Sequence, residues 1–359
     1  MVEARGIETL SLSFTAGVIA GTILPGGSPV AFSLLLSAIL FPCFFPSLIA
    51  RIPGAGGRAV MTAVFLGLGI FCAWNAAIPG ISSETLVEDL ARDAALRLRQ
   101  LIDRLSFPTE GTAPLLKALL TGDRSGLSRE TTAVFRRSGA SHILALSGLH
   151  IGIIYLLFDK LSRVLGRSAP VRRLRFVLMI LGAGFFTLMT GAGPSIVRAF
   201  LFILINETLQ LLHRPRNSVR VLCLALLVQL VLSPQVIRSV GFQLSYLAMA
   251  GIFLLYPVME KWYPQGSRWD PVRKIWTMAA LSISCQVFTA PLAWLRFHSF
   301  PRFFLLCNLL ALPITTALIT AATGTVILGA IGWCPPLLIK ATDGLCRLLV
   351  WVLEIISSL

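Results

Sequence analysis

Three polar residues interrupt an otherwise apolar string, SHILALSGLHIG, at positions 141–152. They are His142, Ser147 and His150. Polar groups at membrane depth are costly unless they face other protein or a water-filled cavity. On one continuous helix His142 and His150 would lie about 80° apart, so their rings could share a broad face. Two interpretations follow: polar lining of a pore, or hydrogen bonding between helices beside a close contact at Gly148.

A single cation, Arg198, lies in the string TGAGPSIVRAFLF at positions 190–202. Gly193 and Pro194 predict a tight turn, with Pro194 placed to start the next helix. Arg198 then falls one turn inside that helix. Its guanidinium could reach the membrane interface by snorkelling, or it could bind a phosphate at a pore mouth. Glu207 is nine residues further on and faces the other side of the helix, which excludes an intrahelical ion pair.

Other polar residues also fall inside apolar stretches or close to their ends. Gln243 lies in GFQLSYLAMAGI, and for Gln243 and Asn308 hydrogen bonding between helices is the favoured interpretation. Asn308 and Pro313 together predict a broken or re-entrant helix, because irregular backbone at membrane depth must be sheltered or line water. Arg296 and Arg302 are further candidates for contact with phosphates in a pore.

The string LLTGDRSGLS, at positions 119–128, is polar enough to lie outside the membrane. Gly122 predicts a helix end, and Ser128 predicts the N-cap of the following helix. Asp123 and Arg124 remain, and we interpret them as a local turn pair rather than a binding site.

No motif of the sequence predicts catalysis, a metal or a cofactor. The chain has no GxxxxGK[ST] phosphate loop, no HExxH, no GxSxG and no dense His/Asp cluster. No carboxylate or thiol is placed to complete a metal site with His142 and His150. The seven cysteines form no CxxC pair, and their positions in apolar stretches indicate small buried hydrophobic side chains.

Taken in order, the four strings and a fifth, FHSFPRFFLLCNLLALPI at positions 297–314, closely resemble the competence domain of the ComEC family. That family imports single-stranded DNA during natural transformation. The resemblance covers about 115–320 well. It implies an inner-membrane channel for single-stranded DNA, working with a separate nuclease, DNA receptor and cytoplasmic helicase. The OB-like domain and the metallo-β-lactamase-like domain of many members have no counterpart in this sequence.

The elements that carry these strings are predicted to be membrane helices. Hydrophobic residues make up 56% of the 359 and charged residues 13%, with a mean hydropathy of +0.82, whereas soluble domains are about a quarter charged. A spanning helix needs about 20 mostly apolar residues. Such stretches run through 7–25, 28–50, 59–78, 139–158, 175–191, 195–212, 219–233, 240–257, 276–295 and 303–320, with two more in 321–333 and 337–357. The predicted fold is therefore an all-α polytopic transmembrane bundle of about 10–12 spans.

The net charge of +15 is unevenly distributed among the loops. Basic residues crowd 159–175, 213–220 and 261–274, while the alternate loops are nearly uncharged. This is the positive-inside pattern, and it predicts a cytoplasmic N-terminus and an exterior segment 79–137. Most of the positive charge thus reports orientation in the inner membrane of a bacterium rather than DNA binding.

Three parts of the chain are predicted. Residues 1–78 form a three-helix membrane unit, residues 79–137 an exterior segment, and residues 138–359 the channel core. Within the exterior segment, 84–105 has the spacing of an amphipathic helix, which either lies on the outer membrane face or packs across the bundle. Small residues at Gly17 and Gly21, and at Gly148 and Gly152, predict close helix packing.

Three other functions remain open. One is a transporter for another solute, which would have a closed midplane site built on broken helices. Another is a membrane scaffold that transports nothing and docks partners on its amphipathic helix. An intramembrane hydrolase ranks last, because the sequence offers no nucleophile–base pair.

Overall fold

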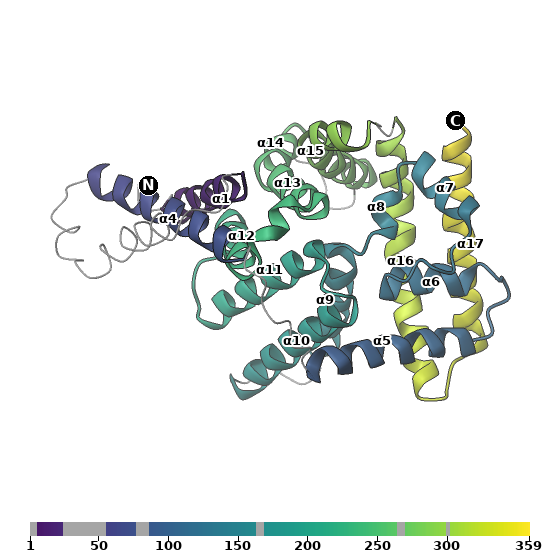
Figure 1. Cartoon of the computed structure of the whole chain (residues 1–359). Helices are drawn as coiled ribbons and strands as arrows, with labels where there is room; N and C mark the ends of the chain where they lie inside the picture. The colour runs from purple at the N-terminus through teal and green to yellow at the C-terminus, as the bar shows by residue number, and fades with distance from the viewer. Residues whose placement is uncertain (1–5, 24–54, 77–85, 163–168, 264–269, 299–301) are drawn as a thin grey trace. The chain divides into compact units, whose positions relative to one another are not determined.

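The computed structural model describes residues 6–23, 55–76, 86–162, 169–263, 270–298 and 302–359 (Figure 1). All regular elements in these ranges are helices, and no strand occurs among them. In chain order they are α1 (Gly6–Ile23), α4 (Ala55–Asn75), α5 (Leu86–Arg104), α6 (Thr112–Thr121), α7 (Arg129–Arg137), α8 (Ser141–Leu144), α9 (Gly148–Ser162), α10 (Ala169–Met189), α11 (Pro194–Leu211), α12 (Ser218–Leu232), the 3-10 helix η3 (Pro234–Arg238), α13 (Val240–Leu254), α14 (Tyr256–Glu260), α15 (Pro271–Phe297), α16 (Phe304–Ala330) and α17 (Pro336–Ser358).

The all-α polytopic fold is confirmed. Within the described ranges, five helical segments are long and apolar enough to cross a membrane: α1, α11, α13 together with α14, α15 and α16. Two shorter apolar helices, Ala59–Asn75 and Ser218–Leu232, follow the same pattern. The predicted span over 28–50 lies outside the described residues, and the total of 10–12 spans stays a prediction.

The predicted break at Asn308 and Pro313 is wrong. Both residues lie within α16, which continues for 27 residues and joins two predicted segments. A proline inside a helix removes one backbone donor and bends the helix, but neighbouring helices can compensate for this in a membrane bundle. Pro291 is accommodated in the same way inside α15.

The contacts divide the chain into two compact units. The first comprises Met1–Ser83 and Leu201–Tyr246, and the second comprises Glu84–Phe200 and Leu247–Leu359. These bounds differ from those of the three parts predicted from the sequence, because Leu201–Tyr246 groups with the N-terminal helices.

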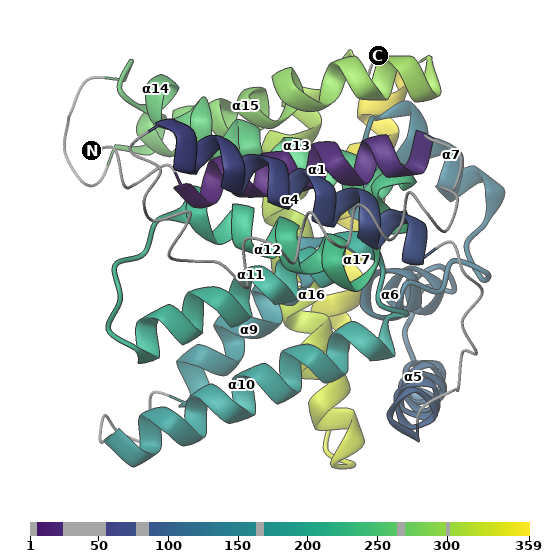
Figure 2. The ribbon, with the colours of Figure 1, turned by 60° about the vertical axis from the view of Figure 1, so that its left-hand side comes forward.

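In the first unit, α1 and α4 lie side by side with their backbones in contact (Figure 2). A Cβ added at Gly17 would lie 2.0 Å from the Leu66 carbonyl oxygen, and one added at Gly69 would lie 2.2 Å from that of Phe14. Only glycine permits so close an approach, so the close packing predicted at Gly17 is confirmed. The Ser11 hydroxyl donates to the Cys223 carbonyl at 3.0 Å and ties α1 to α12.

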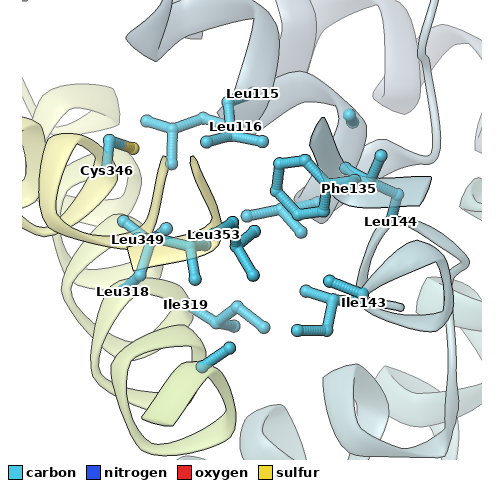
Figure 3. Close-up of a cluster of buried hydrophobic side chains, with 14 of the residues drawn as sticks. Leu115, Leu116, Phe135, Ile143, Leu144, Leu318, Ile319, Cys346, Leu349 and Leu353 are labelled. Carbon is cyan, nitrogen blue, oxygen red and sulfur yellow. The ribbon is translucent and has the colours of Figure 1, made fainter. Parts of the chain in front are cut away.

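In the second unit, α5 to α8 pack against α16 and α17 (Figure 3). The central side chains are Leu115 and Leu116 from α6, Phe135 from α7, Ile143 and Leu144 from α8, Leu318 and Ile319 from α16, and Cys346, Leu349 and Leu353 from α17. The segment predicted to be exterior therefore buries its apolar side chains against α17 and against α16, which is apolar enough to cross a membrane.

The amphipathic helix predicted over 84–105 is α5. It buries Ala91, Ala95 and Ile102 and contacts α6, α10 and α16. Of the two arrangements that the sequence left open, packing across other helices describes this part of α5. The first two turns of α5 do not pack in this way, since Leu86 and Leu90 are exposed.

The contact between α1 and α4 predicts how two glycine substitutions should differ. Gly17→Ala should destabilise the protein by about 1–3 kcal/mol, because the new methyl group meets backbone that cannot move aside. Gly152→Ala is the control: an added Cβ there meets nothing within 4 Å, so the better helix former should be neutral or stabilising. Thermal unfolding of the detergent-solubilised variants would measure both. Equal stability of the two variants would contradict the close contact.

Candidate functional site at a helix break

The string at 141–152 forms two helices rather than one. α8 ends at Leu144 and α9 begins at Gly148, with an irregular connection over 145–147. The continuous helix predicted here is therefore wrong, and so is the shared helical face of His142 and His150. His142 belongs to α8, whereas His150 lies in the first turn of α9.

Ser147 and His150 hold the start of α9. The backbone N–H of Leu149 donates to Ser147 Oγ at 3.3 Å, and the backbone N–H of Ser147 donates to His150 Nδ1 at 3.2 Å. This is the reciprocal pattern of a capping box, with an imidazole where glutamate or glutamine is usual. Since helix N-termini leave backbone donors open, Ser-x-x-His explains why α9 begins where it does.

The cap also assigns the tautomer of His150. Because Nδ1 accepts a backbone N–H, the ring proton of the neutral imidazole lies on Nε2. His150 is 2% exposed, and its Nε2 has no hydrogen-bond partner among the described residues. Leaving a buried donor unpaired costs about 1–3 kcal/mol. An acceptor from outside the protein would satisfy it.

Ser147 Oγ also lies 3.2 Å from His150 Nδ1. This is the distance of a nucleophile–base pair, but the lone pair of Nδ1 already accepts the Ser147 backbone N–H. The ring is also buried. The arrangement is therefore a helix cap, and it gives no support to the hydrolase interpretation.

Gly122 and Ser128 behave as the sequence predicts. Gly122 ends α6 in the left-handed conformation, with φ 77° and its N–H bonded to the Ala118 carbonyl. Ser128 caps α7 by accepting from the Thr131 N–H at 3.0 Å. Both predictions from this string are confirmed.

Asp123 and Arg124 do not pair with each other, so the predicted turn pair is wrong. Asp123 forms an ion pair with Arg99 of α5 at 3.1 Å. Arg124 donates from Nη2 to the Leu144 carbonyl at 2.9 Å, which is the carbonyl at the end of α8. A Cβ added at Gly122 would lie 2.5 Å from Leu146 Cδ1. The loop after α6 thus packs against the break and satisfies one of its backbone acceptors.

The same loop lowers the pKa of the Asp123 carboxyl. The Ser125 hydroxyl and backbone N–H both donate to Oδ1, at 2.7 and 3.0 Å. These two hydrogen bonds, followed by the charge of Arg99, hold the pKa of Asp123 below its ordinary value of 3.8. The ionised form is therefore the one that the folded loop stabilises.

Arg198 approaches the break from α11, which begins at Pro194 as predicted. Its side chain is buried, with the residue 7% exposed. A Cβ added at Gly148 would lie 3.0 Å from Arg198 Nη2, so the glycine leaves room for the guanidinium at the start of α9. Burial does not favour snorkelling, in which the guanidinium would end in water.

The first turn of α9 and Arg198 have the same electrostatic sign. A helix N-terminus carries about half a positive charge, and the guanidinium carries a full one. Two positive groups in contact favour an anionic group between or beside them, and helix N-termini are common sites for phosphates. The backbone N–H groups of Ser147, Leu149 and His150 are already bonded within the cap, so the donors suited to a phosphate oxygen are the guanidinium and the His150 Nε2–H.

His142 and Asn308 meet on the other side of the break. His142 Nδ1 lies 3.1 Å from the Gly139 carbonyl oxygen, and the ring is also near the Asn308 side chain of α16. Asn308 Oδ1 is buried and has no aligned hydrogen-bond partner among the described residues, so the two groups are close without forming a well-directed bond. His142 is exposed.

The remaining candidates lie elsewhere. Gln243 belongs to the first unit, where its Nε2 donates to the Ile237 carbonyl at 2.7 Å. Arg296 and Arg302 are exposed where α15 ends and shortly before α16 begins. An added Cβ at Gly152 or Gly193 meets nothing within 4 Å, so a close helix contact at Gly152 is wrong. Gly148 does lie at a close contact, with Arg198 and Ala199.

Sequence reasoning missed two buried carboxylates. Asp343, in α17, is 2% exposed and accepts hydrogen bonds from Thr109 and Thr112. Asp159 of α9 pairs with Arg175 of α10. The signal was present in both cases, since a carboxylate within or beside an apolar stretch needs a partner. Across the described ranges, no group of three or more His, Cys, Asp or Glu residues could hold a metal ion.

The amino-acid sequence is similar to a protein family and to several known proteins. The family model described as Competence protein matches residues 119–359. The chain is 26% identical over 248 residues to ComE operon protein 3 of Bacillus subtilis, covering 68% of this chain and 30% of that protein. It is 26% identical over 254 residues to Recombination protein 2 of Haemophilus influenzae, with coverages of 68% and 32%. Competence protein ComA of Neisseria gonorrhoeae is 28% identical over 175 residues, 47% of this chain and 25% of that protein.

The chain therefore spans less than a third of the length of these relatives. No solved structure matches it.

The lowered pKa of Asp123 predicts a pH-dependent contribution to stability. A carboxyl with a folded pKa below its unfolded value contributes stability above the unfolded pKa and loses it as pH falls through the folded pKa. Asp123→Asn should therefore be less stable at pH 7, by about 0.5–1 kcal/mol for a partly exposed pair. The deficit should shrink as the pH falls below about 4.

Melting temperatures of the two proteins across this pH range measure the effect. Asp103→Asn, which removes the exposed partner of Lys117, is a control that should change the melting temperature little. A deficit of Asp123→Asn that stays constant down to pH 2 would contradict the assignment.

Proposed function

Because this chain belongs to the competence protein family, we propose that its helical bundle forms a channel that carries single-stranded DNA across the inner membrane during natural transformation. The family match confirms the resemblance predicted from the five strings, and a role in DNA uptake follows from the family. The channel activity and the cargo are the parts that we propose.

The observation that carries the proposal is the buried Arg198 at the start of α9. Its guanidinium lies against Gly148, beside a helix N-terminus and near the end of α9 that holds the unpaired His150 Nε2–H. Guanidinium groups bind phosphate oxygens through two parallel hydrogen bonds. These donors would hold the backbone of a strand and ignore its bases, as uptake of any sequence requires.

The proposal gives the surrounding residues supporting tasks. Ser147 and His150 start α9, and Arg124 satisfies the carbonyl at the end of α8. His142 and Asn308 would line the path on the far side of the break. The partners that this function requires are single-stranded DNA, a lipid bilayer, and a separate nuclease, DNA receptor and cytoplasmic helicase. We assign no catalytic step to this chain.

One observation favours a second candidate, a transporter for another solute. Broken helices form the substrate sites of many secondary transporters, with helix N-termini directed at anionic groups. The α8–α9 break has this form. An anionic solute would use the same donors as a phosphodiester.

We further propose that the N-terminus is cytoplasmic and the loop between α5 and α6 is exterior, since the basic loops alternate with nearly uncharged ones. Single cysteines at Ser106 and Arg216, both exposed, would test this in a background with the native thiols replaced. A membrane-impermeant maleimide should label position 106 in intact cells and position 216 only after lysis. Labelling of position 216 in intact cells would reverse the orientation.

The function itself is tested at Arg198. Arg198→Ala should lower DNA uptake per molecule of protein about tenfold or more, the value of a charge-assisted hydrogen bond. Arg198→Lys should retain part of the uptake, because it keeps the charge and loses the planar fork. Arg137→Ala, at an exposed position on α7, is the matched control and should behave as the wild type.

Uptake is measured as labelled strand protected from external nuclease, in a transformable host that carries this gene as its only copy. The amount is normalised to folded protein in the membrane. A loss that merely follows lower abundance would make Arg198 a packing residue. Unchanged uptake after deletion of the whole gene would remove the DNA channel and leave the solute transporter.

A further inference from the structure

A second basic site lies away from the helix break, between α17 and the loop that follows α5. Here a polar cavity of about 380 Å³ is lined by Pro108, Thr109, Lys340, Asp343 and Arg347. This volume is within the range of sites that bind small molecules. α17 runs beside the loop, as Figure 1 shows.

The carboxylate of the cavity is already satisfied by neutral donors. Asp343 Oδ1 accepts from the Thr109 backbone N–H at 3.1 Å and from the Thr112 hydroxyl at 2.6 Å, and Oδ2 accepts from the Thr109 hydroxyl at 3.0 Å. A buried carboxylate needs such bonds to remain charged. Asp343 therefore fixes the loop against α17 and shapes the wall of the cavity.

The two cations of the cavity are less engaged. Only Nε of Arg347 approaches Asp343, at 3.5 Å, and its side chain is 68% exposed. Among the residues that the structure describes, Lys340 is exposed and has no ion-pair partner. Lys340 and Arg347 are seven residues apart, which places them on the same side of α17 about two turns apart. Glu110 is next to Thr109 in the loop but does not line the cavity.

The cavity thus has two positive charges and one negative charge that is occupied by three hydrogen bonds. This excess of positive charge suits an anion with several oxygen acceptors, and lysine and arginine are the side chains that bind phosphates. Thr109, which also lines the cavity, has a small polar side chain and leaves room beside Lys340 and Arg347.

We propose that this cavity binds a phosphodiester of the single strand through Lys340 and Arg347, at a position separate from the Arg198 contact. The inference rests on the proposed function, because it takes single-stranded DNA as the cargo. It adds a second phosphate contact on α17, with Asp343 and Thr109 as positioning residues that hold the cavity open.

The test uses the purified chain in nanodiscs of phosphatidylcholine and a fluorescent 20-nucleotide oligothymidylate, a length of about 20 chosen to exceed one binding segment. Binding is followed by anisotropy over a series of NaCl concentrations. Each phosphate contact contributes about 0.7 to the slope of log K against log salt for single strands. The double variant Lys340→Gln/Arg347→Gln should therefore reduce the slope by about 1.4 and weaken binding about tenfold or more at low salt.

A matched variant, Arg136→Gln/Arg137→Gln, removes the same charge from exposed positions of α7. It should leave the slope near that of the wild type. Both double variants spare Asp343, and equal melting temperatures would show that the fold is intact.

The outcomes separate the two proposals. If the wild type binds and the Lys340/Arg347 variant keeps its slope, the cavity inference is overturned while the function stands. If the wild type binds no strand, both fall. A third outcome combines two results. If the wild type and the Lys340/Arg347 variant have equal salt slopes, and native mass spectrometry finds phosphatidylglycerol bound to the wild type alone, the cavity is assigned to a lipid headgroup instead.

Discussion

The arrangement of the second unit depends on how an interrupted helix satisfies its open backbone groups. An apolar bundle offers no water to an unpaired N–H or carbonyl, so irregular backbone persists only where side chains or neighbouring segments supply partners. Between α8 and α9 these partners come from two parts of the sequence. Ser147 and His150 close the start of α9, and Arg124 closes the end of α8. Gly122 makes room for Leu146 within the break.

Local features of the fold could be predicted from the sequence, because their causes are local. Gly122 and Ser128 act within one turn of their helices, and the amphipathic helix α5 follows from the spacing of its own residues. The break between α8 and α9 was missed because no proline or glycine marks residues 145–147, and Leu146 looks like part of an apolar helix. The opposite error occurred in α16, where Pro313 suggested a break that the surrounding helices absorb.

The candidate site was harder to predict, since its contacts join residues far apart in the chain. His142, Ser147, His150 and Arg198 were recognised as polar groups in apolar surroundings, and this rule needs no knowledge of the fold. Their grouping needed the structure: Gly148 meets Arg198 across 50 residues of sequence, and His142 meets Asn308 across 166. Asp343 was overlooked although the same rule applies to it. Its hydroxyl donors, Thr109 and Thr112, look like ordinary loop and helix residues.

The loop after α6 has a mechanical consequence. Asp123 is bonded to Arg99 of α5, and Arg124 to the last carbonyl of α8. These two attachment points are consecutive residues, with Cα atoms about 3.8 Å apart. A single peptide unit therefore connects the residue bonded to α5 with the residue bonded to α8. This unit is stiff because a peptide bond is planar. The loop is therefore a short, rigid connection between α5 and α8. If α5 moves further than the side chains of Arg99 and Arg124 can follow, either α8 moves with it or one of the two bonds breaks.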